Sequence, residues 1–334
     1  MKYTEDFEVS KSYKQKYFDG LKNILKSRQK DAENIRDEYA KNIFSAQEIY
    51  REDLKKMLGW PLTGCNEKGI KGIETTLLSE EDGYKIYRMQ FEMLNGLVMT
   101  GLLFKQNGGE KKPLVLVQHG GHGTPELISG IYGDTFNYND MLQRVRKNDV
   151  HVFAPQLLLW HDKYEVEYDR RAFDAELKRV GSSITAIEVF GLMRILDYFE
   201  KQEYVSDFGM VGLSYGGFYT LFTAALDTRI KSAISCAYFN KRDAIGWSDW
   251  VWENSALKFD DAEVACLVYP RKLKLAIGDA DEIFNFKFGL ESFEKVKKMS
   301  KEGGCDWVRL YVFHGVHEFF YDDEPIRKLI NDIK

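Results

Sequence analysis

The residues best placed to do chemistry in this sequence are Gly-Leu-Ser-Tyr-Gly-Gly at positions 212–217. An apolar, strand-like run at 208–213 leads into this stretch, and a helix-like run at 218–226 follows it. A serine between a strand and a helix is typical of a nucleophile elbow, whose strained turn projects the hydroxyl into a cleft. We therefore interpret Ser214 as a nucleophile, with a glycine-rich turn and a surface serine as the alternative.

An activated serine needs a base, and the base needs an acid to orient it, because a hydroxyl is a weak nucleophile at neutral pH. In a strand–turn–helix site of this kind, the acid follows the serine along the chain and the histidine comes last. The acid candidates are Asp279 and Asp281, directly after a strand-like run at 273–277. Asp281 lies further from the strand end and is favoured, and capping of the next helix is the alternative role for either residue.

The histidine candidates are His314 and His317, which follow another strand-like run at 308–313. Loops that follow parallel strands meet at one edge of a sheet, so the acid and the histidine are expected beside the elbow. His317 lies deeper in its loop, from which the ring can swing back over the serine. We therefore favour His317 as the base and interpret His314 as a structural hydrogen-bonding residue.

A second glycine-rich loop, His-Gly-Gly-His-Gly at 119–123, follows the strand-like run 114–118. An oxyanion hole needs one N–H from such a loop and one from the residue after the nucleophile. We expect these donors to be the backbone N–H groups of Gly121 and Tyr215. The loop lacks the Lys-Ser/Thr of a P-loop and the spacing of a dinucleotide-binding turn, which disfavours nucleotide binding.

The expected substrate pocket is aromatic. Three tryptophans lie in the stretch 238–270, between the strand after the elbow and the strand before the acid. Their rings suit either a wall of the cleft or a hydrophobic plug that anchors the insertion. The residues predicted to line the pocket are His122, Trp160, Trp247 and Trp250.

Alternating apolar runs and helical patterns from residue 114 onward predict an α/β fold with a mostly parallel central sheet and helices on both faces. Three strand-like segments come before this region, at 72–79, 84–93 and 97–105, and turn residues separate them. Asn95-Gly96 between two apolar runs is a strong hairpin signal, so the sheet is expected to begin with antiparallel strands.

Residues 10–58 show apolar side chains at spacings of three and four, with Lys, Glu and Asp on the other faces. This pattern predicts two or three amphipathic helices that pack on the main domain, with partner binding or oligomerisation as the alternative. The chain is accordingly divided into an N-terminal helical extension at 1–70 and an α/β domain at 71–334.

The composition excludes several classes of protein. A net charge of −5 without a dominant basic block argues against a nucleic-acid partner. The four cysteines form no C-x-x-C pair and no cluster with histidines, so we expect reduced thiols and no metal site. The N-terminus does not resemble a signal peptide, and no apolar run approaches the roughly 18 residues of a membrane span. We therefore expect a cytoplasmic protein without a membrane partner.

The motifs at 119–121, 212–217, 278–281 and 315–317, taken in this order, make the chain resemble an α/β-hydrolase over roughly residues 70–334. The Gly-x-x-Asp and Gly-x-His spacings of that superfamily further favour Asp281 and His317. The chain resembles most the branch of dienelactone hydrolases and acetyl xylan esterases, which often carries a helical N-terminal extension. It departs from acetyl xylan esterases at Tyr215, where they usually have Gln.

The catalytic domain of prolyl oligopeptidases is the second resemblance, because its elbow is commonly Gly-x-Ser-Tyr-Gly-Gly. Those enzymes carry a β-propeller or a comparable gate, for which the sequence before the oxyanion loop is too short. The first resemblance implies a serine esterase for small acyl groups that acts on a small-molecule ester without a metal or organic cofactor. In it Ser214 attacks, His317 transfers the proton and Asp281 orients the imidazole.

Two other functions stay open at this point. One is a peptidase or amidase of prolyl-oligopeptidase type, in which Asp249 or Glu253 would bind a free amino terminus. The other is a non-catalytic binding protein on a hydrolase fold. Homo-oligomerisation is also left open, because the sequence does not tell what the N-terminal helices cover.

Overall fold

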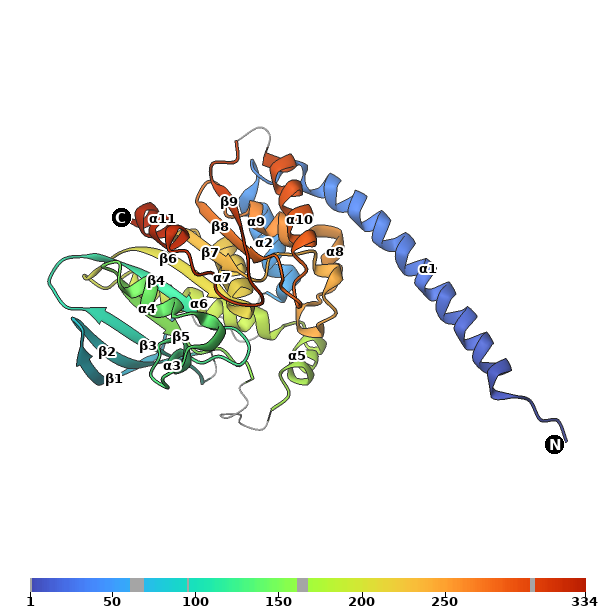
Figure 1. Cartoon of the computed structure of the whole chain (residues 1–334), viewed down its shortest axis with the longest axis horizontal. Helices are drawn as coiled ribbons and strands as arrows, with labels where there is room; N and C mark the ends of the chain where they lie inside the picture. Colours follow the sequence, from blue (N-terminus) through green and yellow to red (C-terminus); the bar gives the residue numbers. More distant parts are fainter. Residues whose placement is uncertain (1, 61–68, 95, 161–167, 301–303) are drawn as a thin grey trace.

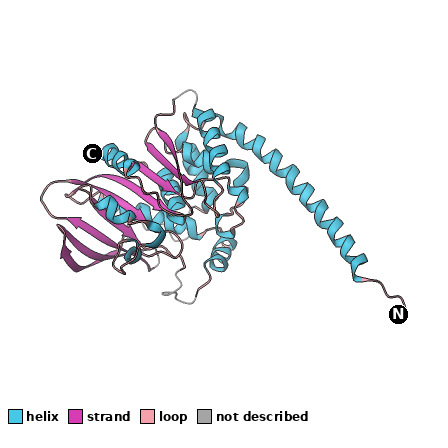
Figure 2. Cartoon of the chain, viewed as in Figure 1, coloured by secondary structure: helices cyan, strands magenta, loops and turns pink. Residues whose placement is uncertain are grey.

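A nine-stranded sheet runs through the protein (Figure 2). The structure is a computed structural model that describes residues 2–60, 69–94, 96–160, 168–300 and 304–334. The strand order is β1-β2-β3-β5-β4-β6-β7-β8-β9. The strands are β1 (Gly72–Glu81), β2 (Tyr84–Met93), β3 (Leu97–Gln106), β4 (Lys112–Gln118), β5 (His151–Pro155), β6 (Val205–Leu213), β7 (Ile230–Cys236), β8 (Lys272–Gly278) and β9 (Val308–Phe313).

The predicted change from antiparallel to parallel pairing is confirmed. Strands β1, β2, β3 and β5 pair antiparallel in that order, whereas β5, β4, β6, β7, β8 and β9 are all parallel. Gly96 closes the hairpin between β2 and β3 with a φ of 86°, and its predicted partner in the turn, Asn95, lies outside the described residues. Because the strands from β4 to β9 point the same way, the loops that follow them share one edge of the sheet.

Helices cover both faces of the sheet, as predicted (Figure 1). They are α1 (Phe7–Tyr39), α2 (Gln47–Leu58), α3 (Pro125–Ile128), α4 (Met141–Arg146), α5 (Arg170–Arg179), α6 (Ile184–Phe199), α7 (Tyr215–Leu226), α8 (Ser255–Lys258), α9 (Asp261–Cys266), α10 (Phe286–Met299) and α11 (Glu324–Ile333). Alternate residues of β4 point to opposite faces of the sheet and pack into two different hydrophobic clusters. Leu114 and Leu116 pack with residues of α2, α6 and α7, whereas Val115 and Val117 pack with residues of α4 and α11.

Helix α2 belongs to the main core rather than to a separate appendage. Leu54 and Leu58 are fully buried there. Arg51 fixes the helix by donating from Nε to the carbonyl oxygen of Ala225 (3.0 Å) and from Nη2 to that of Leu267 (3.1 Å). The helix ends at Gly59, whose φ of 115° places it in the left-handed region.

Helix α1 leaves the body, and the prediction that the whole helical segment packs on the main domain is wrong for its first six turns. The only buried residues of α1 are Ala32 and Arg36, near its C-terminal end. Figure 1 shows the rest extending away from the sheet. The apolar spacing predicts the helix correctly but cannot say which surface covers it. No helix among the described residues is long and apolar enough to cross a membrane.

We expect Leu54→Ala to lower the free energy of unfolding by about 2–5 kcal/mol, because it leaves a cavity in the main core. Ile49→Ala on the same helix is the matched control. Ile49 is 67% exposed, so its loss should cost less than about 0.5 kcal/mol. Urea titration of both variants measures the difference. Equal effects would mean that α2 does not share the core.

Candidate active site

Ser214 sits at a strained turn between β6 and α7. Its φ of 61° and ψ of −123° lie outside the regions that non-glycine residues usually occupy. The neighbouring glycines make the turn possible. A Cβ atom at Gly212 would lie 2.3 Å from the carbonyl oxygen of Gly216, and one at Gly216 would lie 2.2 Å from that of Gln118. The serine N–H donates to the carbonyl oxygen of Cys236 (2.9 Å), which holds the turn against β7.

The loops after β8 and β9 bring the favoured acid and histidine together. His317 Nδ1 lies 2.9 Å from Asp281 Oδ2, and the exposed fractions of the two side chains are 17% and 1%. The other carboxylate oxygen, Oδ1, accepts from the N–H groups of Ile283 (2.8 Å) and Phe284 (2.9 Å). The Phe284 ring stacks on the imidazole at 5.5 Å. The carboxylate is therefore held on both oxygens, and the imidazole is held at its edge and on its face.

The alternative acid and histidine, Asp279 and His314, also form a pair, but at the surface. His314 Nδ1 lies 3.1 Å from Asp279 Oδ2, and the His314 side chain is 95% exposed. This hydrogen bond lowers the pKa of Asp279. Two Asp–His pairs thus stand side by side on adjacent loops, and burial distinguishes them. Pairing through Nδ1 leaves Nε2 of His317 for proton transfer.

The glycine-rich loop after β4 lies directly against the elbow. A Cβ atom at Gly120 would lie 2.6 Å from the carbonyl oxygen of Leu213 and 2.9 Å from Ser214 Cβ. The Tyr138 hydroxyl accepts from the Gly120 N–H (2.9 Å) and donates to the Gly121 carbonyl (3.3 Å). The glycine loop with one predicted oxyanion donor, Gly121, is thus fixed beside the serine. The other predicted donor, Tyr215, directly follows Ser214 as the first residue of α7.

His119, as a neutral imidazole, forms hydrogen bonds that fix this glycine-rich loop. Nδ1 lies 2.9 Å from the carbonyl oxygen of Gly120, and Nε2 accepts from the N–H of Leu157 (3.1 Å). The ring is fully buried, and burial lowers the pKa of His119 to about 4. Charging the ring would require an acceptor at Nε2, where the Leu157 N–H already points.

A short segment at 137–139 ties the oxyanion loop to the histidine loop. Asn137 donates from Nδ2 to the carbonyl oxygen of His317 (3.0 Å) and accepts from the N–H of Phe319 (2.8 Å). Its neighbour Tyr138 makes the contacts to the glycine loop given above. No motif in the sequence marks these two residues. Their role depends on a contact across about 180 residues of chain, which no local spacing reveals.

Four aromatic rings, named the aromatic wall from here on, are in contact in series from the oxyanion loop to the imidazole, and two of them, Tyr215 and Phe284, are buried. Trp160 meets Tyr215 edge-on at 5.1 Å, Tyr215 stacks on Trp247 at 5.4 Å, and Trp247 meets Phe284 at 5.8 Å. The other two, Trp160 and Trp247, are half-buried. Trp250 is completely buried, which corrects its prediction as a pocket residue, because it packs behind Tyr215 and Trp247 as part of the core.

His122 is placed beside Trp160, with which it was predicted to line the pocket. The Trp160 indole N–H donates to His122 Nε2 at 2.6 Å, and the His122 N–H donates to the Trp160 carbonyl oxygen at 2.8 Å. A Cβ atom at Gly121 would lie 2.8 Å from the indole ring. The indole therefore covers the glycine loop directly.

A buried charge network holds Tyr215 in place. Its hydroxyl donates to Asp249 Oδ2 at 2.8 Å, and Arg170 and Arg171 approach the same carboxylate at 3.2 and 3.3 Å. Burial raises the pKa of Tyr215 well above its usual value. Asp249 is fully buried and paired with two arginines, so it is not available to bind a free amino terminus. This removes one of the two acidic residues on which the peptidase interpretation depended.

Among the described residues, no group of three His, Cys, Asp or Glu side chains is arranged to hold a metal ion. The triad chemistry suggested by Ser214, His317 and Asp281 uses protein groups alone.

No protein-family model matches the sequence, and no curated protein matches it. Solved structures do match. The chain is similar to a glucuronoyl esterase from Solibacter usitatus, with 14% identity and a TM-score of 0.65 over 88% of this chain and 93% of the other. It is also similar to acetyl xylan esterase 1 from Thermoanaerobacterium sp. JW/SL YS485, with 14% identity and a TM-score of 0.55 over 86% and 94%.

A third similar structure is a cold-adapted esterase from an Arctic intertidal metagenomic library. It shares 20% identity with this chain at a TM-score of 0.55, over 79% of this chain and 99% of the other. These likenesses confirm the predicted α/β-hydrolase fold.

The neutral His119 makes stability depend on pH. The unfolded imidazole binds a proton near pH 6.5 but the folded one only near pH 4, so the unfolded state binds more protons between these values. The neutral imidazole therefore contributes to the free energy of unfolding. This contribution is fully present above pH 6.5, and as the pH falls toward 4 it is lost by up to about 1.4 kcal/mol per pH unit. His119→Gln should remove this part of the slope.

Urea titrations at several pH values measure the slope for the wild type and for His119→Gln. His314→Gln, at an exposed imidazole, is the matched control and should keep the wild-type slope. Identical slopes for all three proteins would show that His119 accepts a proton in the folded state.

Proposed function

We propose that this protein is a serine hydrolase that cleaves a carboxylic ester through an acyl-enzyme. The observation that carries the proposal is the buried Asp281–His317 pair, at 2.9 Å, on the sheet edge where the elbow presents Ser214. Three loops that are far apart in the sequence supply these groups in the order that the chemistry needs. The three similar solved structures named above are esterases, which supports the same reaction.

Each residue has a definite role in the proposed reaction. Ser214 Oγ attacks the acyl carbon while Nε2 of His317 accepts its proton. The same nitrogen then protonates the departing alcohol, and Asp281 stabilises the imidazolium. Water hydrolyses the acyl-enzyme by the reverse sequence of proton transfers. The N–H groups of Gly121 and Tyr215 donate to the oxyanion, which gains most from donors that are fixed before the reaction begins.

The proposed substrate is a small molecule with a small acyl group. Trp160, Tyr215, Trp247 and Phe284 contact one another in series, with ring centroids 5.1 to 5.8 Å apart. Tyr215 and Phe284 are buried and Trp160 and Trp247 are half-buried, and a tightly packed cluster of this kind favours a small acyl group over a long one. One of the similar structures is an acetyl xylan esterase.

A cytoplasmic location is part of the proposal. The described cysteines, Cys236, Cys266 and Cys305, are all free thiols, and the first two are buried. Free thiols suit a reducing compartment.

Ser214→Ala should abolish ester hydrolysis, because the proposed reaction begins with attack by the Ser214 hydroxyl oxygen. We expect kcat/KM to fall by at least about 10⁴-fold. The measurement uses 4-nitrophenyl esters of increasing acyl length, on which the wild type should prefer acetate. Ser248→Ala, at an exposed position near Trp247, is the control and should retain full activity. A Ser214→Ala protein with more than a trace of turnover would overturn the assignment.

The two Asp–His pairs should differ sharply in their contribution to activity. Asp281→Asn keeps the shape of the side chain but removes the charge that favours the imidazolium, so kcat/KM should drop by roughly 10³- to 10⁴-fold. Asp279→Asn at the exposed pair should cost less than about tenfold. Steady-state kinetics on the same acetate ester measure the loss of kcat/KM in each variant. A larger loss for Asp279→Asn would transfer the catalytic role to the His314 pair.

A further inference from the structure

Helix α1 carries an apolar face that the described residues of its own chain leave largely exposed. Six large apolar side chains between residues 13 and 25 are 45% to 72% exposed. They recur at helical spacing and share one side of the helix, and Figure 1 shows this part of α1 standing clear of the body. The six residues, named the α1 face from here on, are Tyr13, Tyr17, Phe18, Leu21, Ile24 and Leu25.

An exposed apolar face of this size indicates a binding surface for a partner. With about 200 Å² for a full aromatic side chain, the α1 face exposes on the order of 600 Å². That is at the upper end of the apolar patches that monomeric proteins expose. A helix in water also gains little stability from propensity alone, and most of its stability comes from packing of its apolar side. Gly20, in the middle of the face's span, makes an unpacked helix less stable still.

The charge of α1 narrows the choice of partner. Residues 7–30 contain seven Lys and Arg against two acidic residues, whereas the rest of the chain contains 40 basic and 50 acidic residues. Two α1 helices would therefore repel each other, since like charges along adjacent helices are unfavourable. The acidic body of a second copy attracts the same helix.

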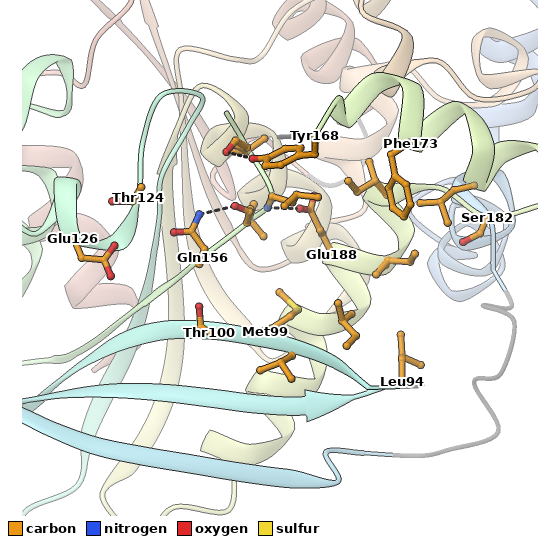
Figure 3. A pocket seen from close by; sticks show the side chains of 18 of the residues that line it. Leu94, Met99, Thr100, Thr124, Glu126, Gln156, Tyr168, Phe173, Ser182 and Glu188 are labelled. Carbon is orange, nitrogen blue, oxygen red and sulfur yellow. Dashed lines mark hydrogen bonds between the residues drawn. The ribbon is translucent and has the colours of Figure 1, made fainter. Parts of the chain in front are cut away.

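The body offers an apolar groove of suitable character. A cavity of about 680 Å³ lies between β3, α5 and α6 (Figure 3). Apolar side chains on its walls are exposed although they are large, with Val98 at 46%, Phe173 at 53% and Val180 at 70%. Figure 3 shows Phe173 on α5 above the cavity and Met99 on β3 below it. Like the α1 face, this groove is not covered by described residues of its own chain.

We propose that the protein forms a dimer in which α1 of each copy lies in the apolar groove of the other. The exchange covers the α1 face and the groove at once, and it closes under two-fold symmetry so that no further copy can add. Each helix would bury roughly 600 Å² against a similar area of groove. The reciprocal pair then buries on the order of 2,000 Å², which is the size of a stable, specific interface.

The first test compares the mass of the full chain with that of matched variants, by light scattering after size exclusion. Wild type should be a dimer at micromolar concentration. Leu21→Asp with Ile24→Asp places two charges on the α1 face and should weaken dimerisation by about 100-fold or more. Asn23→Asp with Ser27→Asp adds the same charge on the opposite face and should leave the dimer intact.

The groove is tested in the same way on α5. Phe173→Asp with Val180→Asp should give a monomer, and Ala172→Asp with Ala175→Asp, on exposed positions that do not line the cavity, should stay dimeric. The altered side chains are exposed in the single chain, so all variants should fold, and the monomeric ones should unfold at a lower temperature only by the amount that dimerisation contributes. A dimer that survives the groove variant but not the α1-face variant would mean pairing between α1 helices, and would overturn the exchange.

Mixing the two monomeric variants is the most direct way to distinguish the exchange of α1 helices from pairing between α1 helices. The groove variant has an intact α1 and the α1-face variant has an intact groove, so the mixture should recover a dimer through one of the two contacts. No recovery would overturn the exchange. A monomeric wild type would also overturn it, and α1-dependent sedimentation of that monomer with phosphatidylglycerol vesicles would identify an anionic lipid surface as the partner instead.

Discussion

The close contact between β6, the first turn of α7 and the loop after β4 is the constraint on which the site depends. Glycines at 212 and 216 let three backbones meet at distances that a single methyl group would prevent. This packing holds Ser214 at a φ of 61°, a conformation that costs about 1–3 kcal/mol and persists only because the surroundings enforce it. The same contact lays Gly120 against the serine and turns the start of α7 toward it. The contact between β6, α7 and the loop after β4 thus positions the nucleophile and both proposed oxyanion donors.

Burial gives the two Asp–His pairs different properties although their chemistry is the same. In water, solvent screens the attraction between a carboxylate and an imidazolium, and such pairs contribute little. Asp279 and His314 are in this situation. Asp281 is shielded from water and accepts three hydrogen bonds in total, including the one from His317. In that environment a charge-assisted bond is stronger, and the stacked Phe284 ring limits how the imidazole can turn.

The polar groups that orient the site lie in parts of the chain that carry no motif. Residues 137 and 138 join the glycine loop to the histidine loop, and Asp249 with its arginines anchors Tyr215 from behind. Buried charges persist only when they are paired and hydrogen-bonded. Arg170 meets this condition by binding both Asp249 and Glu188. The aromatic wall rests on this network, since Tyr215 is its central ring.

From the sequence alone we predict the nucleophile elbow, the antiparallel start and parallel remainder of the sheet, the order of serine, acid and histidine, and the amphipathic character of α1. These follow from local spacing and chain order, which are properties of the sequence alone. The packing of the described residues adds which Asp–His pair is buried, that Trp250 is buried while Trp247 is half-buried, that Tyr138 and Asn137 fix the two loops, and that most of α1 stands clear of the body. Each of these depends on how deeply a side chain lies among residues distant in the chain, and that depth is set by the packing of whole elements rather than by any residue's neighbours in sequence.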